Sequence, residues 1–302
     1  MKLLLLFLPV VYGFILPFPK VDYTQRKTIL DIDNTFSNVT YFSEYDITIS
    51  KRESICGEKN ESIFVFPGID MSGFSFFPNS IKTSVYKNTY VVLAGYSKKQ
   101  TLYDIVNCVN QFIKSKKIKN ITIVGESFGG IVAIYMCNSL RYNNVSSLIL
   151  LNPAIEYENS QICEYINSIE FDKKELTKFI LNNGPPFQRV LTSFYEFSYH
   201  FPCYIVYYIQ SYFMMFSNIV FTSEEQILKR LKTYFSIPKK DIYKACKKIK
   251  IPTTIVIGKN DTILPCKGLE ISRNIKNSEL KELEEVTHMI LFSDIDFTSL
   301  HR

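Results

Sequence analysis

The chain has 302 residues, of which 46% are hydrophobic and 21% are charged, and its formal net charge at pH 7 is +6. This length and composition suit one globular domain, or one domain with a large insertion, and they exclude a disordered chain. The basic residues form neither a stripe with interleaved aromatic residues nor a known nucleic-acid-binding motif, so we expect no nucleic-acid partner.

The chain begins MKLLLLFLPVVYGFILPFP, which has the features of a short secretory signal peptide: Lys2, then an apolar run, then Gly13. We expect residues 1–20 to be a signal or targeting segment that routes the protein into the secretory pathway or the endoplasmic reticulum. The Gly13-Phe14 junction also resembles the Phe-led cleavage site of presequences in algae with complex plastids. The alternative is an N-terminal anchor that is not cleaved.

From residue 60 onward, short apolar runs rich in β-branched residues alternate with stretches of helical periodicity. Helices are expected at 102–113, after the capping residue Thr101, and at 131–140. Continuous apolar strands alternating with helices predict a mostly parallel central sheet with helices on both faces. The expected strands are Ile63–Phe66, Tyr90–Ala94, Ile121–Val124, Ser147–Leu151 and Thr253–Ile257, with Leu280–Val286 as a plausible last strand.

The alternation breaks down at residues 155–250, which predicts a helical cap, or lid, inserted between core parts 21–154 and 251–302. The stretch from Phe201 to Ser223 has no charged residue and is long enough to span a membrane. Pro202 and several polar side chains argue against a span. Aromatic and methionine side chains suit a lid over an acyl pocket or a helix lying in a lipid surface. A lid or interfacial helix and a true span both remain open.

The expected strand at 121–124 runs into Gly125-Glu126-Ser127-Phe128-Gly129, a G-x-S-x-G pattern, and a helix follows. This strand–turn–helix context places a serine on a sharp, strained turn with its hydroxyl exposed at the edge of the sheet. Glycine is needed at 125 and 129 because a Cβ there would collide with a neighbouring element. Ser127 is therefore the candidate nucleophile.

A serine hydroxyl needs a base, and the base needs a carboxylate to orient it. His288 follows the plausible last strand, whereas His200 lies in the predicted cap and His301 is the penultimate residue. Asp261 follows the strand at 253–257. The chain order Ser, Asp, His is the one that this kind of sheet requires, so we predict that Ser127, Asp261 and His288 form a catalytic triad.

The tetrahedral intermediate of acyl chemistry needs hydrogen-bond donors for its oxyanion. We expect one donor to be the backbone N–H of Phe128 and the other to be that of Ile69, in the loop after the first strand. Gly68 allows the backbone of this loop to approach the substrate, and we assign Gly68 and Phe128 to substrate binding. The seven cysteines are scattered and show neither a metal-ligand spacing nor a disulfide framework, so we expect no metal and no cofactor.

Four segments carry a resemblance to the α/β-hydrolase superfamily, and more narrowly to the hydrolase-like region of plant plastid phytyl ester synthases and their esterase and lipase relatives. They are Phe66-Pro67-Gly68-Ile69-Asp70, Val124 to Gly130, Leu151-Asn152-Pro153-Ala154, and Gly258-Lys259-Asn260-Asp261. The resemblance implies transfer of an acyl group onto phytol or diacylglycerol, from acyl-CoA, acyl-carrier protein or a galactolipid.

The sequence thus predicts a serine esterase or lipase, or an acyltransferase, that acts on a lipid-like acyl ester through an acyl-serine intermediate. The apolar cap and the N-terminus predict association with a membrane surface. Two alternatives remain: a non-lipid serine hydrolase or peptidase of the same fold, and a catalytically silent, membrane-associated protein of that fold.

Overall fold

A computed structural model describes thirteen stretches of the chain, and the predicted targeting segment 1–20 and most of the predicted cap lie outside them. Within the described residues, no helix has both the length and the apolar character to cross a lipid bilayer. The described residues are 28–31, 35–54, 59–76, 82–97, 100–140, 144–160, 163–164, 218, 222–234, 236–264, 268–284, 286–288 and 290–292.

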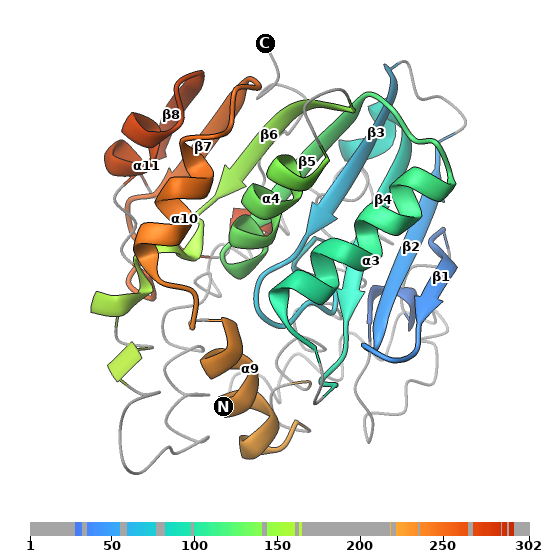
Figure 1. Ribbon diagram of the computed structural model, residues 1–302, viewed down its shortest axis with the longest axis horizontal. Helices are drawn as coiled ribbons and strands as arrows, with labels where there is room; N and C mark the ends of the chain where they lie inside the picture. Colours follow the sequence, from blue (N-terminus) through green and yellow to red (C-terminus); the bar gives the residue numbers. More distant parts are fainter. Residues whose placement is uncertain are drawn as a thin grey trace, which may run out of the picture.

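The described part of the chain forms a twisted sheet with the strand order β1-β2-β4-β3-β5-β6-β7-β8 (Figure 1). Strand β2 is antiparallel to β1 and β4, and the other neighbouring pairs are parallel, which confirms the predicted mostly parallel sheet. The strands are β1 (Ser37–Phe42), β2 (Ile47–Glu53), β3 (Lys59–Phe66), β4 (Tyr86–Ala94), β5 (Ile121–Glu126), β6 (Val145–Leu151), β7 (Thr253–Gly258) and β8 (Ser278–Leu283).

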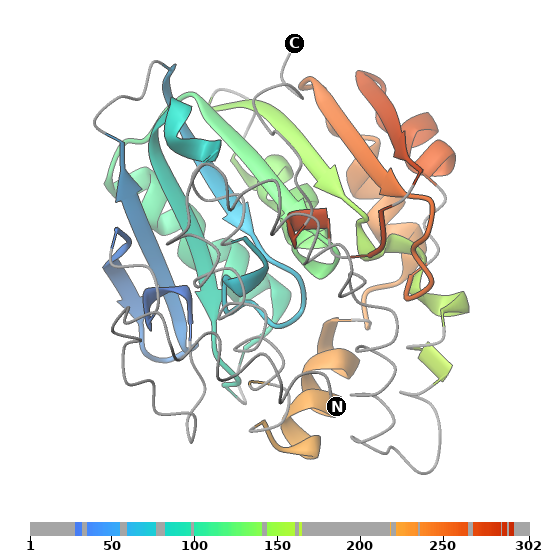
Figure 2. The same ribbon diagram turned by 180° about the vertical axis from the view of Figure 1, so that it is seen from behind.

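Among the described residues, α-helices cover one face of the sheet (Figure 1) and short 3₁₀ helices lie against the other (Figure 2). The first layer contains α3 (Leu102–Ser115), α4 (Phe128–Ser139), α10 (Lys239–Cys246) and α11 (Gly268–Asn274). The second contains η1 (Ile29–Asp31), η2 (Phe74–Phe76) and η5 (Ile290–Phe292). Each layer buries its own apolar cluster against the sheet.

The central strands are apolar at successive positions because both faces are covered. Every residue of β5 is buried, whereas β8, at the edge, contains only half-buried and exposed residues. Helix α3 begins at a reciprocal capping box in which the Thr101 N–H donates to Asp104 and the Asp104 N–H donates to Thr101.

Several elements differ from the sequence prediction. Strands β1 and β2 were not expected, because their mixed polar composition lacks the apolar runs of the inner strands. Strand β8 ends at Leu283 rather than at residue 286. Helix α4 begins at Phe128 rather than at Ile131, immediately after the candidate nucleophile.

Helix α9 (Glu224–Tyr234) lies past the carboxyl ends of the strands (Figure 1). This is the edge of the sheet where β3, β5 and β7 all end. Side chains of the loops that follow these strands therefore meet in one region of the fold.

Candidate active site

Ser127 occupies the turn between β5 and α4 in a backbone conformation that is unusual for a residue with a side chain. Its φ is 53° and its ψ is −119°, which is costly and persists only where the surroundings hold it. Its N–H donates to the Leu151 carbonyl at 2.9 Å, and its carbonyl accepts from Gly130 at 3.0 Å and from Ala154 at 2.9 Å. The turn is thus held from both strand β6 and helix α4.

Two glycines on either side of Ser127 let β5 and α4 approach this closely. A Cβ on Gly125 would collide with the Gly129 carbonyl oxygen and with Ala133, and a Cβ on Gly129 would collide with the carbonyl oxygens of Phe66 and Pro67. The carbonyl oxygens are backbone atoms, which cannot move aside as a flexible side chain could. Glycine is therefore required at both positions, as the G-x-S-x-G pattern implies.

The side chains of Ser127, His288 and Asp261 form one hydrogen-bonded line. The Nε2 atom of His288 lies 2.8 Å from the Ser127 Oγ, and its Nδ1 atom lies 2.8 Å from the Asp261 Oδ2. All three residues are buried, each 7% exposed. The three residues lie 134 and 27 positions apart in the chain, and the fold brings them together where β5, β7 and β8 end.

Asp261 is held by the loop that follows β7. Its Oδ1 accepts hydrogen bonds from the backbone N–H groups of Ile263 and Leu264, both at 3.0 Å, so that Oδ2 is left facing His288. These two hydrogen bonds fix the orientation of the carboxylate group. A charged Asp261 orients the imidazole ring with its Nδ1–H toward the carboxylate and leaves Nε2 to accept from the serine hydroxyl.

The pKa of His288 is raised above its ordinary value by this arrangement. Burial disfavours the imidazolium and would lower the pKa, but the charge of Asp261, its hydrogen bond and the nearby Glu126 together favour the protonated ring. The site therefore stabilises the imidazolium that forms when the base takes a proton.

Sequence reasoning missed the role of Asn152, the residue after β6. Its side-chain amide donates to the carbonyl oxygens of Thr287 at 2.9 Å and His288 at 3.0 Å, and its Oδ1 accepts from the Gly258 N–H at 2.9 Å. Asn152 thus joins the loop that carries His288 to the end of β7. Its positive φ of 40° is typical of the left-handed conformation that asparagine tolerates.

Glu126, immediately before the serine, was also missed. Its carboxylate is 2% exposed, accepts from the Leu291 N–H at 2.6 Å and hydrogen bonds to Ser75. Burial raises the pKa of Glu126 to about 7, although the Leu291 and Ser75 hydrogen bonds and His288 oppose the rise. Glu126 therefore joins the turn at Ser127 to η2 and η5 and titrates near neutral pH.

The two predicted oxyanion donors, the N–H groups of Phe128 and Ile69, belong to the start of α4 and to the loop after β3. Phe128 is the first residue of α4, where the backbone N–H groups point out of the helix end. The loop after β3 passes over the nucleophile, since a Cβ on Gly68 would lie 3.7 Å from the Ser127 Cβ. The Gly68 carbonyl accepts from the Met71 N–H at 2.9 Å, so the plane of the Gly68–Ile69 peptide is held in a turn.

The described residues contain no cluster of three or more His, Cys, Asp or Glu side chains placed to hold a metal ion. The side chains gathered at this site are a hydroxyl, an imidazole and a carboxylate, which belong to the predicted nucleophile, base and orienting residue. What this arrangement can do chemically is acyl transfer through the serine hydroxyl.

Comparison with known proteins places this geometry in context. The sequence pattern of the family described as alpha/beta hydrolase fold matches residues 68–295. No curated protein sequence matches the chain.

Among solved structures, an esterase from Exiguobacterium antarcticum is similar, with 20% identity, a TM-score of 0.54, and coverage of 84% of this chain and 92% of that chain. A lipase-esterase related protein from Clostridium acetobutylicum has 19% identity, a TM-score of 0.58, and coverage of 81% and 93%. A bromoperoxidase from Bacillus anthracis has 16% identity, a TM-score of 0.57, and coverage of 84% and 94%. At these identities the likeness concerns the fold alone.

Proposed function

The chain belongs to the α/β-hydrolase fold family, and from this premise we propose that it is a serine hydrolase that acts on a lipid-like acyl ester through an acyl-Ser127 intermediate. The observation that carries the proposal is the line from the Asp261 carboxylate through the His288 imidazole to the Ser127 hydroxyl, with both contacts at 2.8 Å. Such a line activates a hydroxyl that is otherwise a poor nucleophile at neutral pH.

In the first half-reaction, the Ser127 Oγ attacks the acyl carbon while the His288 Nε2 takes the hydroxyl proton. The imidazolium is stabilised by Asp261 and then gives the same proton to the leaving alcohol as the tetrahedral intermediate collapses. The products are the acyl enzyme and the free alcohol. The raised pKa of His288 fits this role, because the site favours the charged ring.

The oxyanion of the tetrahedral intermediate would be held by the backbone N–H groups of Ile69 and Phe128. This proposal is supported by the closeness of Gly68, the residue before Ile69, to Ser127 and by the position of Phe128 at the start of α4. Donors fixed before the reaction stabilise the developing charge at no cost of reorganisation.

In the second half-reaction, His288 activates an acceptor that attacks the acyl enzyme. Water would make the protein an esterase or lipase, and an alcohol such as phytol or diacylglycerol would make it an acyltransferase. The proposal of a lipid-like acyl group is supported by the apolar, aromatic stretch around residues 201–221 of the sequence. The same stretch and the N-terminal segment 1–20 support a proposed association with a membrane surface.

A fluorophosphonate probe tests the nucleophile. We expect covalent labelling of the full-length protein and loss of labelling in Ser127→Ala. Ser147→Ala, which removes another buried hydroxyl, should be labelled as strongly as the parent protein. If the parent protein resists the probe while folded, or if Ser127→Ala is still labelled, the proposal is wrong.

Two substrate assays then define the reaction. With p-nitrophenyl esters of rising chain length, a preference for long acyl chains is expected, whereas a preference for short chains, or none, would favour a non-lipid hydrolase or peptidase. Incubation with a galactolipid and phytol, followed by lipid analysis, distinguishes free fatty acid from phytyl ester. Absence of any product with a probe-reactive protein would contradict the lipid assignment and leave the serine chemistry intact.

A further inference from the structure

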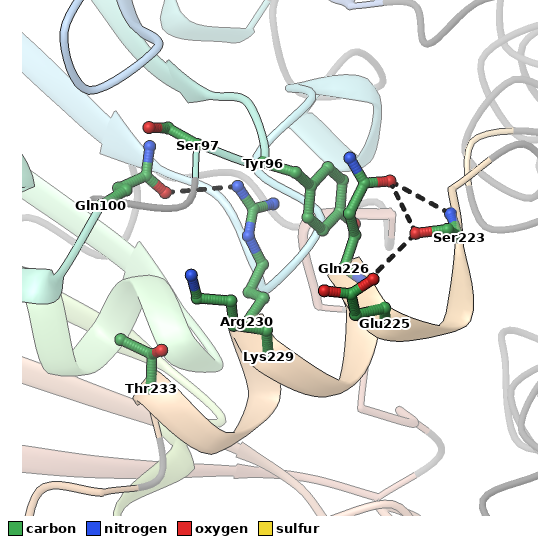
Figure 3. Close-up of a pocket in the computed structure, with 9 residues that line it drawn as sticks. All are labelled: Tyr96, Ser97, Gln100, Ser223, Glu225, Gln226, Lys229, Arg230 and Thr233. Atoms are coloured by element: carbon green, nitrogen blue, oxygen red, sulfur yellow. Dashed lines mark hydrogen bonds between the residues drawn. The ribbon is translucent and has the colours of Figure 1, made fainter.

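Arg230, on helix α9, has a buried charged group that takes no part in the hydrogen-bonded line of the active site. The residue is 6% exposed, and its guanidinium stacks over the Tyr96 ring at 3.8 Å from the ring centroid. A guanidinium stays charged when it is buried, so it needs hydrogen-bond acceptors for its N–H groups. Figure 3 shows the group directed from α9 toward Gln100 and Tyr96.

The acceptors of Arg230 come from two loops that follow neighbouring strands. Its Nη1 donates to the carbonyl oxygens of Ile69 at 3.1 Å and Asp70 at 3.2 Å, in the loop after β3. Its Nη2 donates to Ala94 at 3.0 Å and to Gly95, at the end of β4, and to the Gln100 side chain at 3.3 Å. One planar cation therefore joins the loop after β3 to the end of β4.

One acceptor of Arg230 is the carbonyl oxygen of Ile69, the residue whose N–H is a predicted oxyanion donor. The peptide plane before Ile69 is held because the Gly68 carbonyl accepts from the Met71 N–H at 2.9 Å. The plane after Ile69 is held because its own carbonyl accepts from Arg230. The Ile69 N–H lies in the first of these planes, opposite the Gly68 carbonyl, so the Met71 bond sets its direction. The Arg230 bond holds the adjoining plane, which shares the Ile69 Cα, and so anchors the segment of the loop that carries this N–H.

We propose that Arg230 is a positioning residue for the oxyanion hole: it holds the loop after β3 so that the Ile69 N–H faces the reacting carbonyl beside Ser127. This inference rests on the proposed function. The loop has an intrinsic need for such support, because Gly68 has wide conformational freedom and leaves the loop without a side-chain restraint on that side.

A solvent-facing cavity of about 210 Å³ adjoins Arg230, between α9 and the loop after β4 (Figure 3). Lys229, the residue before Arg230 on α9, is exposed and lines this cavity. It carries the same charge as Arg230. Lys229→Gln is therefore a control that removes a positive charge from the same turn of helix α9.

The test compares Arg230→Lys and Arg230→Gln with Lys229→Gln in the full-length protein. Lysine keeps the charge but cannot reproduce a planar fork of donors, so both Arg230 variants should lower kcat/KM on a p-nitrophenyl ester by about 10- to 100-fold. Loss of an oxyanion donor outright costs ~100- to 1,000-fold, and a misdirected donor should cost less. Lys229→Gln should stay within about twofold of the parent protein.

A pair of inhibitors separates positioning from a general structural effect. A trifluoromethyl ketone forms a hemiketal with the serine and places an oxyanion in the hole, whereas the matched methylene analogue, which has no carbonyl, reports binding alone. In Arg230→Lys, the inhibition constant of the trifluoromethyl ketone should rise by the same factor as kcat/KM falls. That of the methylene analogue should change by less than about twofold. Equal losses for both inhibitors, or no loss for either, would overturn the inference.

Hydrogen–deuterium exchange gives a readout that does not depend on activity. In Arg230→Lys, amides of residues 67–72 should exchange faster than in the parent protein and in Lys229→Gln, because the loop has lost its anchor. Unchanged exchange in these residues would overturn the role of Arg230 even in an active enzyme. Faster exchange in a protein that fluorophosphonates do not label would instead show that the proposed function, and not the anchoring by Arg230, has failed.

Discussion

The side-chain amide of Asn152 donates a hydrogen bond to the backbone carbonyl of His288 at 3.0 Å. The two residues are 136 positions apart in the chain, and the contact sets the position of the candidate base through its backbone while Asp261 sets its ring. A second contact, to the Thr287 carbonyl at 2.9 Å, strengthens the connection. A base that must meet a hydroxyl at hydrogen-bond distance depends on such support, because small displacements of catalytic groups are costly.

Asn152→Ala should therefore reduce kcat by about 10- to 100-fold with little effect on KM, since it displaces His288 without touching the substrate. It should also cost about 1–3 kcal/mol of stability, because three backbone groups, two of them buried, lose their partner. Steady-state kinetics and urea unfolding measure the two effects.

Asn138→Ala is the matched control for this variant. The Asn138 amide also donates to two carbonyl oxygens, those of Ile134 at 3.1 Å and Ala245 at 3.0 Å, but it joins α4 to α10. This variant should lose stability and keep its kcat. Similar kinetics in both variants would contradict a specific role for Asn152.

Glu126→Gln should change the dependence of stability on pH. The pKa of Glu126 is about 7 in the folded protein against an ordinary 4.5, so the folded state holds the proton more tightly than the unfolded chain. Its contribution is fully present below pH 4.5 and is lost as pH rises to about 7. At ~1.4 kcal/mol for each pKa unit, the loss amounts to about 3 kcal/mol.

The measurement is the free energy of unfolding of both proteins in urea between pH 4 and pH 8. The parent protein should lose stability relative to Glu126→Gln as the pH rises through this window, and the difference should level off above it. Parallel curves for the two proteins would show that Glu126 does not carry a raised pKa.

Asp261→Asn should move the acid limb of the pH–rate profile. The pKa of His288 is raised above 6.5, and Asp261 supplies the charge and the hydrogen bond that raise it against the effect of burial. The base must be neutral to accept a proton, so kcat/KM rises with pH through this pKa. Without the carboxylate the inflection should shift to lower pH, and kcat should fall by ~10³- to 10⁴-fold.

Asp241→Asn, which removes an exposed carboxylate from α10, is the control for charge alone. Its pH–rate profile should overlay that of the parent protein. An acid limb that stays in place in Asp261→Asn would mean that another group, and not His288, titrates in the profile.

The parts of the fold that sequence predicts are those in which burial determines composition. Strands such as β5 and β6 are covered on both faces, so their residues are apolar in succession and the pattern is unambiguous. Strand β8 lies at the edge of the sheet, and its residues are half-buried or exposed, so its apolar pattern is weak. Its predicted end at residue 286 was three residues too late.

The start of α4 was missed for a different reason. Gly129 and Gly130 lower the helix propensity of its first turn, but tertiary packing requires them. A Cβ on Gly130 would lie 2.7 Å from the Pro153 Cβ. Close packing of the helix against its neighbours therefore overrides the local preference.

Motif and chain order predict which residues meet at the site, because a strand–turn–helix pattern and the loops after parallel strands have a definite geometry. The supporting contacts of Asn152, Glu126 and Arg230 leave no such pattern. Their hydrogen bonds to backbone groups join residues between 106 and 165 positions apart, and every residue type carries such groups. Only the folded arrangement reveals them.

The glycines of the site offer a test of local geometry in which one variant serves as the control for the other. A Cβ on Gly129 would collide with the carbonyl oxygens of Phe66 and Pro67, whereas the nearest atoms to a Cβ on Gly68 lie at 3.7 Å, an ordinary van der Waals distance. Gly129→Ala should therefore be destabilised by about 4 kcal/mol or more, or fail to fold. The free energy of unfolding of Gly68→Ala should lie within about 1 kcal/mol of that of the parent protein.

Because the added methyl group narrows the approach to Ser127, Gly68→Ala should also show a higher KM while fluorophosphonate labelling persists. Thermal unfolding and ester kinetics on the two variants measure this contrast, and a stable, active Gly129→Ala would refute the close packing of α4 on the loop after β3.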